Sequence, residues 1–123
     1  MIRRSFDETS FAFYLSKLRI HENELQVITK SRISIDVFNV LAIHHYSGKV
    51  MTLKELFLTT QYSQRAVRLV IDEFITEHLV QLSEREEDKR FKFIIPQSKF
   101  IKYYLDSMNL VNSVLNIDWK IAI

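Results

Sequence analysis

Between residues 51 and 96 the spacing of apolar residues changes from a helical to a strand-like pattern. Up to residue 78, apolar residues recur every three or four positions, as on one face of a helix. In the second of two short helical segments they are Val67, Val70, Ile71 and Phe74. From residue 80, apolar and polar residues alternate, as in strands with one buried face. The apolar members of this alternation are Val80, Leu82, Phe91, Phe93 and Ile95. The pattern predicts two helices followed by a β-hairpin.

Capping residues indicate where the two helices begin. Thr52 and Glu55 have the spacing of a capping box, in which each side chain binds the backbone N–H of the other residue. Ser63 is a second N-cap candidate and begins the next helix. Only residues 59–62 separate the two segments, so the helices must cross sharply. This is the spacing of a helix-turn-helix, whose second helix commonly lies in a DNA major groove.

A run of charged residues at 84–90 separates the two predicted strands and is expected to be a solvated loop. A helix-turn-helix followed by a hairpin with a charged tip is a winged helix. The alternative is a generic small α+β domain in which the hairpin is only structural. The predicted fold class is mostly α with a small β-hairpin (α+β): a winged helix-turn-helix with terminal dimerisation helices.

The two ends of the chain carry further apolar stripes at helical spacing. The first follows a capping box at Ser5 and Glu8 and consists of Phe11, Tyr14, Leu15 and Leu18. The second consists of Phe100, Ile101, Tyr104, Leu105, Met108, Val111, Val114 and Leu115, followed by Ile117, Trp119, Ile121 and Ile123. A winged helix does not need both stripes for its own core, and large apolar surfaces are costly to leave in water. We therefore expect a homodimer, the alternative being that the terminal helices pack on each other within one chain.

The chain is expected to form one domain over residues 1–123. Within it, residues 1–32 are the predicted N-terminal dimerisation segment and residues 33–96 the winged helix-turn-helix. Residues 97–123 are the predicted C-terminal dimerisation helix.

Over about residues 28–105 the sequence resembles the MarR family of bacterial transcriptional regulators. The matching segments are 33–41, Thr-Leu-Lys-Glu-Leu at 52–56, Tyr-Ser-Gln at 62–64, Val67, Asp72, His-Leu-Val at 78–80 and Asp-Lys-Arg at 88–90. Three features depart from the family pattern. Gln61 stands where many members have a turn glycine, and His78 replaces the usual glycine after the second helix. Pro-Gln-Ser at 96–98 replaces the usual Leu-Thr-Pro.

The resemblance implies a dimeric, sequence-specific regulator that binds double-stranded DNA. A recognition helix at about 63–78 would enter the major groove, and a wing at about 80–96 would lie near the minor groove. The residues expected on DNA are Ser63, Gln64, Arg65, Arg68, Lys89 and Arg90. The family also implies a small-molecule effector bound between the helical layer and the winged helix. The alternative function is a winged-helix protein–protein interaction module without DNA binding.

The net charge gives the DNA-binding prediction little support. The chain has 17 basic and 15 acidic residues, a formal charge of +2, whereas many nucleic-acid-binding domains are plainly basic. In the predicted wing, Arg85, Lys89, Arg90 and Lys92 are matched by Glu84, Glu86, Glu87 and Asp88. Near-neutral charge and an acidic wing would suit a protein-interaction module.

The sequence lacks the motifs of the common enzyme classes, so neither catalysis nor a cofactor is expected. A single glycine excludes a glycine-rich phosphate loop, and zero cysteines exclude disulfides. His44 and His45 point about 100° apart on a helix, which is unsuited to chelating a metal, and residues 21–24 are expected to be a solvated helix end or loop. We find no signal peptide and no apolar run near the roughly 20 residues that span a membrane. A cytoplasmic location without membrane contact is therefore expected.

Overall fold

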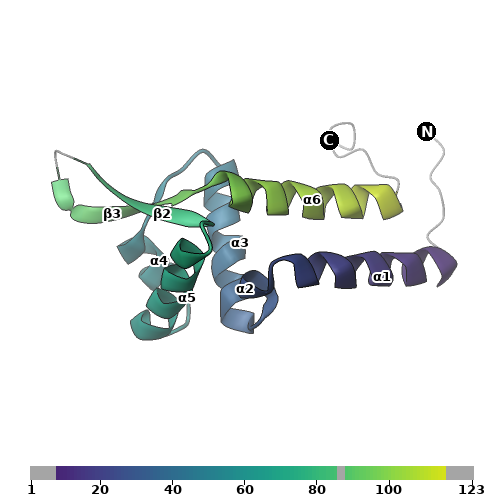
Figure 1. Cartoon of the computed structure of the whole chain (residues 1–123). Coiled ribbons are helices and arrows are strands. Elements are labelled where there is room, and N and C mark those ends of the chain that lie inside the picture. The colour runs from purple at the N-terminus through teal and green to yellow at the C-terminus, as the bar shows by residue number, and fades with distance from the viewer. Residues whose placement is uncertain (1–7, 86–87, 116–123) are drawn as a thin grey trace. The chain divides into compact units, whose positions relative to one another are not determined.

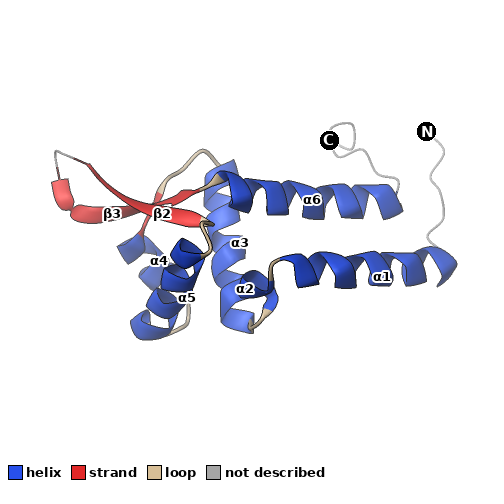
Figure 2. Ribbon diagram, viewed as in Figure 1, coloured by secondary structure: helices blue, strands red, loops and turns tan. Residues whose placement is uncertain are grey.

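The structure is a computed structural model that describes residues 8–85 and 88–115 (Figures 1 and 2). Its elements are α1 (Glu8–Glu24), α2 (Gln26–Thr29), α3 (Arg32–Tyr46), β1 (Met51–Thr52), α4 (Leu53–Thr59), α5 (Gln64–Thr76), β2 (Val80–Arg85), β3 (Asp88–Pro96) and α6 (Ser98–Leu115). These elements form two compact units. The winged-helix unit is Gln26–Ile101, and the helical unit contains the described residues up to Leu25 and from Lys102 onward.

The helix-turn-helix begins as its capping residues predict. The backbone N–H of Glu55 donates to Thr52 Oγ1, and that of Thr52 donates to Glu55 Oε1, each at 3.1 Å. Ser63 Oγ accepts the backbone N–H of Ala66 at 3.1 Å, so Ser63 caps α5. Both predicted helix starts are confirmed.

The backbone after α5 takes a left-handed conformation at His78, the position where the family usually has glycine. His78 has φ = 60° and is the one non-glycine residue with positive φ among the described residues. The N–H of Leu79 reaches back to the carbonyl oxygen of Phe74 at 2.8 Å, which closes the helix end. A residue with a Cβ is strained in this conformation, which glycine adopts freely. Gln61 has no positive φ, so the tight turn forms without a glycine.

The wing belongs to a three-stranded antiparallel sheet in the order β1-β3-β2. Met51 pairs with Ile94 on one side of β3, and Leu82 pairs with the same Ile94 on the other. The predicted two-stranded hairpin was therefore incomplete. The prediction of a loop over residues 84–90 was also wrong, because β2 reaches Arg85 and β3 starts at Asp88.

The two wing strands extend into the charged run because antiparallel pairing is made by backbone groups and needs no buried side chains. Lys92 and Glu84 lie opposite each other and form an ion pair, which further favours this pairing. The register shifts between Glu84 and Arg85, so the outer part of the hairpin is irregular. The predicted wing-tip residues Glu86 and Glu87 lie outside the described residues.

The winged-helix unit has its own hydrophobic core. The largest fully buried side chains come from α3, α4, α5, β3, the segment after α5 and the first turn of α6: Val37, Leu56, Val67, Ile71, Phe74, Leu79, Ile94 and Phe100. The rings of Phe38 and Phe100 lie 4.3 Å apart between centroids. The buried hydroxyl of Ser34 donates to the carbonyl oxygen of Ile28 at 2.6 Å, so it has a partner. This core fixes α5 and the wing in one rigid frame.

In the helical unit, the prediction that residues 21–24 are solvated was wrong for His21. Its side chain is buried, with 8% of the residue exposed, and its ring stacks on Tyr103 at a centroid distance of 4.3 Å. Nε2 of His21 lies 2.5 Å from Ser107 Oγ, and Nδ1 lies 3.6 Å from a Glu24 carboxylate oxygen. The residues that bury His21 lie about 85 positions along the chain, so local sequence gives no sign of them. Burial, followed by the nearby acids Glu22 and Glu24, raises the pKa of Tyr103.

Six large apolar side chains of the helical unit are exposed. Four belong to the predicted stripes and two are further residues of α1: Phe11, Leu15, Leu105 and Met108, and Phe13 and Ile20. The predicted helix start at Ser5 and the apolar residues from Ile117 to Ile123 lie outside the described residues. In the described part of the chain, no helix combines the length and the apolar character needed to cross a membrane.

Candidate nucleic-acid interface

Helix α5 is strongly amphipathic, and its polar face carries four of the predicted site residues. Val67, Val70, Ile71 and Phe74 are buried, which orients the opposite face toward solvent. The N-cap Ser63 and the first-turn residues Gln64 and Arg65 are exposed, as is Arg68. The helix therefore presents its N-terminal turns and their polar groups to a potential partner, as a recognition helix does.

The two arginines of α5 differ in their surroundings. Arg68 Nε donates to Asp72 Oδ1 at 3.1 Å, and both side chains are about half exposed. Such a surface pair contributes only about 0–1 kcal/mol, so Arg68 can exchange Asp72 for another anion. Arg65 forms no ion pair within the described part of the chain. Of the two, Arg65 is the more available cation.

The start of α5 is attached to the core through the turn before it. The hydroxyl of Tyr62 donates to Asp36 Oδ2 on α3 at 2.5 Å. This hydrogen bond, with smaller effects of burial and charge, raises the pKa of Tyr62. The contact fixes the turn, and with it the direction in which Ser63 and Gln64 point.

On the wing, Lys89 and Arg90 are exposed at the start of β3. The guanidinium of Arg90 lies 5.8 Å from the ring centroid of Phe91, and that of Arg85 lies 4.3 Å from the ring of Phe93. These cation–π contacts hold basic groups along the hairpin surface. The side chain of Asp88, which belongs to the matching segment 88–90, lies outside the described residues.

A groove of about 510 Å³ joins the first residue of α5 to the wing. It is lined by Thr52, Leu53, Lys54, Phe57, Gln64, Arg90, Phe91 and Lys92. The predicted site residues Gln64 and Arg90, 26 positions apart in the sequence, thus face the same space. Ser63, Arg65, Arg68 and Lys89 do not line it. Three of its described lining residues are basic and none is acidic, which favours an anionic partner. One of the three, Lys92, is ion-paired with Glu84, so such a partner would displace Glu84 there.

Lys54 and Lys92 were missed in the sequence. Lys54 lies inside the capping-box motif of α4, in which only Thr52 and Glu55 have a recognisable role. Lys92 follows Arg90 by two residues in β3, and residues two apart in a strand share a face. That periodicity could have identified Lys92. No sequence signal places Lys54 opposite the wing, because the two are brought together only by the packing of α4 against the sheet.

Glu55 is the acid nearest to this region along α4, but its charge is engaged in capping. Its side-chain hydrogen bond with Thr52 is the main cause of a lowered pKa, with the Thr52 backbone next. The carboxylate is therefore ionised under neutral conditions. It serves the N-terminus of α4 and does not line the groove.

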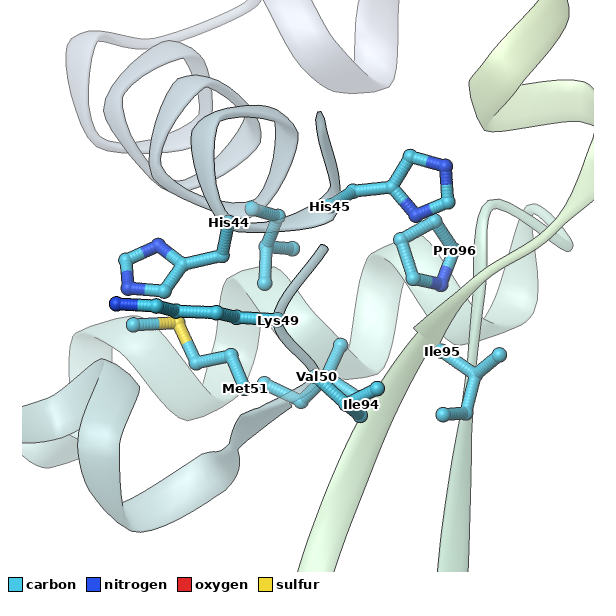
Figure 3. Close-up of a pocket in the computed structure, with 9 residues that line it drawn as sticks. His44, His45, Lys49, Val50, Met51, Ile94, Ile95 and Pro96 are labelled. Carbon is cyan, nitrogen blue, oxygen red and sulfur yellow. The ribbon is translucent and has the colours of Figure 1, made fainter. Parts of the chain in front are cut away.

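A second cavity, of about 180 Å³, lies between the end of α3 and strands β1 and β3 (Figure 3). Its floor is apolar, and His44 and His45 both line it, with Lys49 beside His44 and Pro96 beside His45. His44 Nδ1 contacts the carbonyl oxygen of Val40 at 2.9 Å, which fixes its ring. A cavity of roughly 150 Å³ can hold benzene, so a small ring would fit here. The described residues contain no cluster of His, Asp and Glu suited to a metal ion.

Neither family models nor curated protein sequences match this chain. Its structure is similar to that of MepR from S. aureus in complex with DNA, with a TM-score of 0.63 and 13% identity over 84% of this chain and 82% of MepR. MarR matches with a TM-score of 0.56 and 10% identity over 85% of this chain and 74% of MarR. BpsR of Bordetella bronchiseptica matches with a TM-score of 0.53 and 17% identity over 93% of this chain and 81% of BpsR. The DNA binding of BpsR is regulated by 6-hydroxynicotinic acid.

These neighbours are transcriptional regulators rather than enzymes. At identities of 10–17% the similarity establishes the fold, which is the winged helix of MarR-type regulators. The predicted α+β winged helix-turn-helix and the resemblance to the MarR family, taken as a likeness of fold, are thereby confirmed. Dimerisation through the terminal helices stays a prediction.

Proposed function

We propose that this protein is a cytoplasmic, dimeric transcriptional regulator that binds double-stranded DNA. The observation that carries the proposal is the basic groove between α5 and the wing, which contains Lys54, Arg90 and Lys92 and no described acidic residue. Its position beside the N-terminus of an exposed amphipathic helix is the arrangement that major-groove readers use. The DNA complex of the structurally similar MepR supports the same use of the fold.

In this proposal the residues of α5 and the wing have separate roles. Gln64 and Arg65 face base edges in the major groove, where an amide can bind adenine and a guanidinium can bind guanine in bidentate fashion. Ser63 and Arg68 contact phosphates, with Arg68 leaving Asp72 to do so. Lys89 and Arg90 contact the backbone and the minor groove from the wing, while Lys54 and Lys92 bind the strand that passes between wing and helix.

The dimer and the effector complete the proposal. Two copies of the chain would place two α5 helices in successive major grooves, which doubles the number of basic contacts and offsets the low net charge. The exposed apolar residues of the helical unit supply the surface for this association. A small-molecule effector is proposed by analogy with BpsR. The cavity beside His44 and His45 is large enough for such a ring-sized compound.

The proposal is tested by measuring duplex binding of the full chain and of Arg65→Ala, Arg68→Ala and the double variant. The wild-type protein should bind a selected duplex, and at least one single variant should lose tenfold or more in affinity. Thermal stability should hardly change, because surface substitutions usually fall within about ±0.5 kcal/mol. Arg19→Ala, an exposed arginine in α1, is the matched control and should bind as the wild type does.

Salt dependence separates this function from the alternative. Phosphate contacts release counterions, so affinity for DNA should fall steeply between low and moderate salt. A protein–protein interaction module would bind no duplex even at low salt. Unchanged affinity in the Arg65/Arg68 double variant would remove α5 from the interface and favour that module.

The wing makes a separate, smaller prediction. Arg90→Ala should weaken binding to a similar extent for different duplex sequences, because a backbone or groove-shape contact carries little direct base information. Competition titrations with a panel of duplexes would measure this. A changed base preference in Arg90→Ala would show that the wing is not placed as we propose.

A further inference from the structure

One apolar residue lies at the centre of the otherwise polar face of α5. Leu69 is 56% exposed, a larger fraction than the side chains of Arg68 or Asp72. At about 100° per residue, it lies about 40° around the helix from Arg65, and on the side opposite the buried Val67, Ile71 and Phe74. Single exposed leucines are common on protein surfaces and need no explanation by themselves. This leucine differs from such residues because it lies on the face of α5 that is proposed to contact DNA.

The neighbours of Leu69 define the chemistry that it can meet. Arg65 lies one turn before it, and Arg68 precedes it directly. Asp72 and Glu73 lie one turn after Leu69, but both carboxylates are ion-paired, with Arg68 and Lys30 respectively. Among the described residues, the charge beside Leu69 that has no ion pair is therefore that of Arg65, and a partner that contacts both residues must offer an apolar group next to negative charge.

A DNA major groove has one apolar group of this kind, the C5-methyl of thymine, and it lies between the phosphate backbones. We infer that Leu69 is a specificity-determining residue that contacts the methyl group of a thymine in each half-site. The inference rests on the proposed function and deepens it, because it names a base feature that Gln64 and the arginines cannot read. It predicts a required thymine next to the base pair that Arg65 contacts.

The test removes the methyl group and the side chain independently. A preferred duplex is first selected from a random pool with the full-length wild-type protein. Each thymine is then replaced by deoxyuridine, which lacks only the methyl group. The wild type should lose about fourfold in affinity at one thymine of each half-site, as expected for one buried methyl group. Leu69→Ala should bind thymine and deoxyuridine equally at that position, and Leu69→Met, which keeps an apolar tip, should restore the difference.

Leu58→Ala is the matched control, since Leu58 is an exposed leucine on α4 with 75% of its surface accessible. It should keep the wild-type response to deoxyuridine. The inference is overturned if the wild type is indifferent to every replacement, or if Leu69→Ala keeps the wild-type response at each thymine. A change in oligomeric state of Leu69→Ala, seen by sedimentation, would also overturn it by assigning Leu69 to a protein contact. Failure to select any duplex would instead reject the proposed function, and this inference with it.

Discussion

The winged-helix unit buries a large set of apolar side chains, whereas the described part of the helical unit buries only two residues. In the winged-helix unit, Leu56, Ile71 and Phe74 have essentially no accessible surface. In the helical unit, Phe13 and Ile20 are each 65% exposed. The buried residues of the helical unit's described part are His21 and Tyr103, which are joined by ring stacking.

This difference teaches that, among the described residues, only one of the two regions has an extended hydrophobic core of its own. That core holds α5 and the wing strands together. The exposed residues of the helical unit form an apolar surface of the kind that marks association sites. A symmetric dimer would cover the same residues on both chains. The predictions below test this contrast.

The largest expected effect is the loss of a core side chain in the winged-helix unit. Phe74→Ala should lower the free energy of unfolding by about 3–5 kcal/mol, because it leaves a cavity where the ring was fully buried. Urea unfolding followed by circular dichroism would measure the loss, which should be the same at every protein concentration.

Phe13→Ala is the counterpart in the helical unit, where the ring is exposed within a single chain. Its effect should appear only at concentrations at which chains associate, since binding stabilises by mass action. A large, concentration-independent loss in Phe13→Ala would contradict the contrast by showing that the ring is buried within one chain.

The second prediction concerns association through the helical unit. The wild-type chain should sediment at micromolar concentration with twice the chain mass of 14.7 kDa. Leu105→Glu places a charge on the exposed apolar surface of α6 and should weaken the dimer at least tenfold, which is about 1.4 kcal/mol. Burying a charge without a partner is the physical cause.

Leu58→Glu is the control for this experiment, because Leu58 is equally apolar and more exposed but belongs to the winged-helix unit. It should leave the sedimentation behaviour unchanged. A wild-type protein that sediments as a single chain would reject the dimer. Dissociation by Leu58→Glu and not by Leu105→Glu would move the interface to the winged-helix unit.

The sequence predicts best what depends on neighbouring residues. The capping residues Thr52 and Ser63 and the apolar face of α5 rest on positions three or four apart, and the structure confirms them. The two-residue strand β1 has too few residues for any periodicity, so it could not be foreseen. The burial of His21 depends on Tyr103 and Ser107, far along the chain.

In the candidate site, too, the features set by neighbouring residues could be predicted, and those set by distant residues could not. The exposed positions of Gln64, Arg65 and Arg68 follow from the helical period alone. The groove does not, because Lys54 reaches it only through the packing of α4 against β3. Charge counting does not locate the exposed basic groups, for a related reason. The run at 84–90 contains balanced charges, yet strand pairing leaves Lys89 and Arg90 exposed at the start of β3 and pairs Glu84 with Lys92.

The smallest expected effect is a pH dependence of the α4 cap, which fixes one wall of the groove. The pKa of Glu55 is lowered in the folded chain, chiefly by its hydrogen bond with Thr52. A lowered folded-state pKa means that the stabilisation is complete above the ordinary value of 4.5 and is lost as the pH falls through the folded-state value. Glu55→Gln keeps an acceptor for the cap but cannot titrate. Urea unfolding between about pH 3 and pH 7 should therefore show the wild type slightly more stable than Glu55→Gln at neutral pH, with the difference vanishing in acid.

In a Thr52→Ala background, most of the pH-dependent difference in stability that Glu55→Gln causes should disappear, since Thr52→Ala removes the main cause of the lowered Glu55 pKa. A difference between wild type and Glu55→Gln that grows toward acid pH would contradict the sign of the shift, and with it the role of Glu55 in the cap.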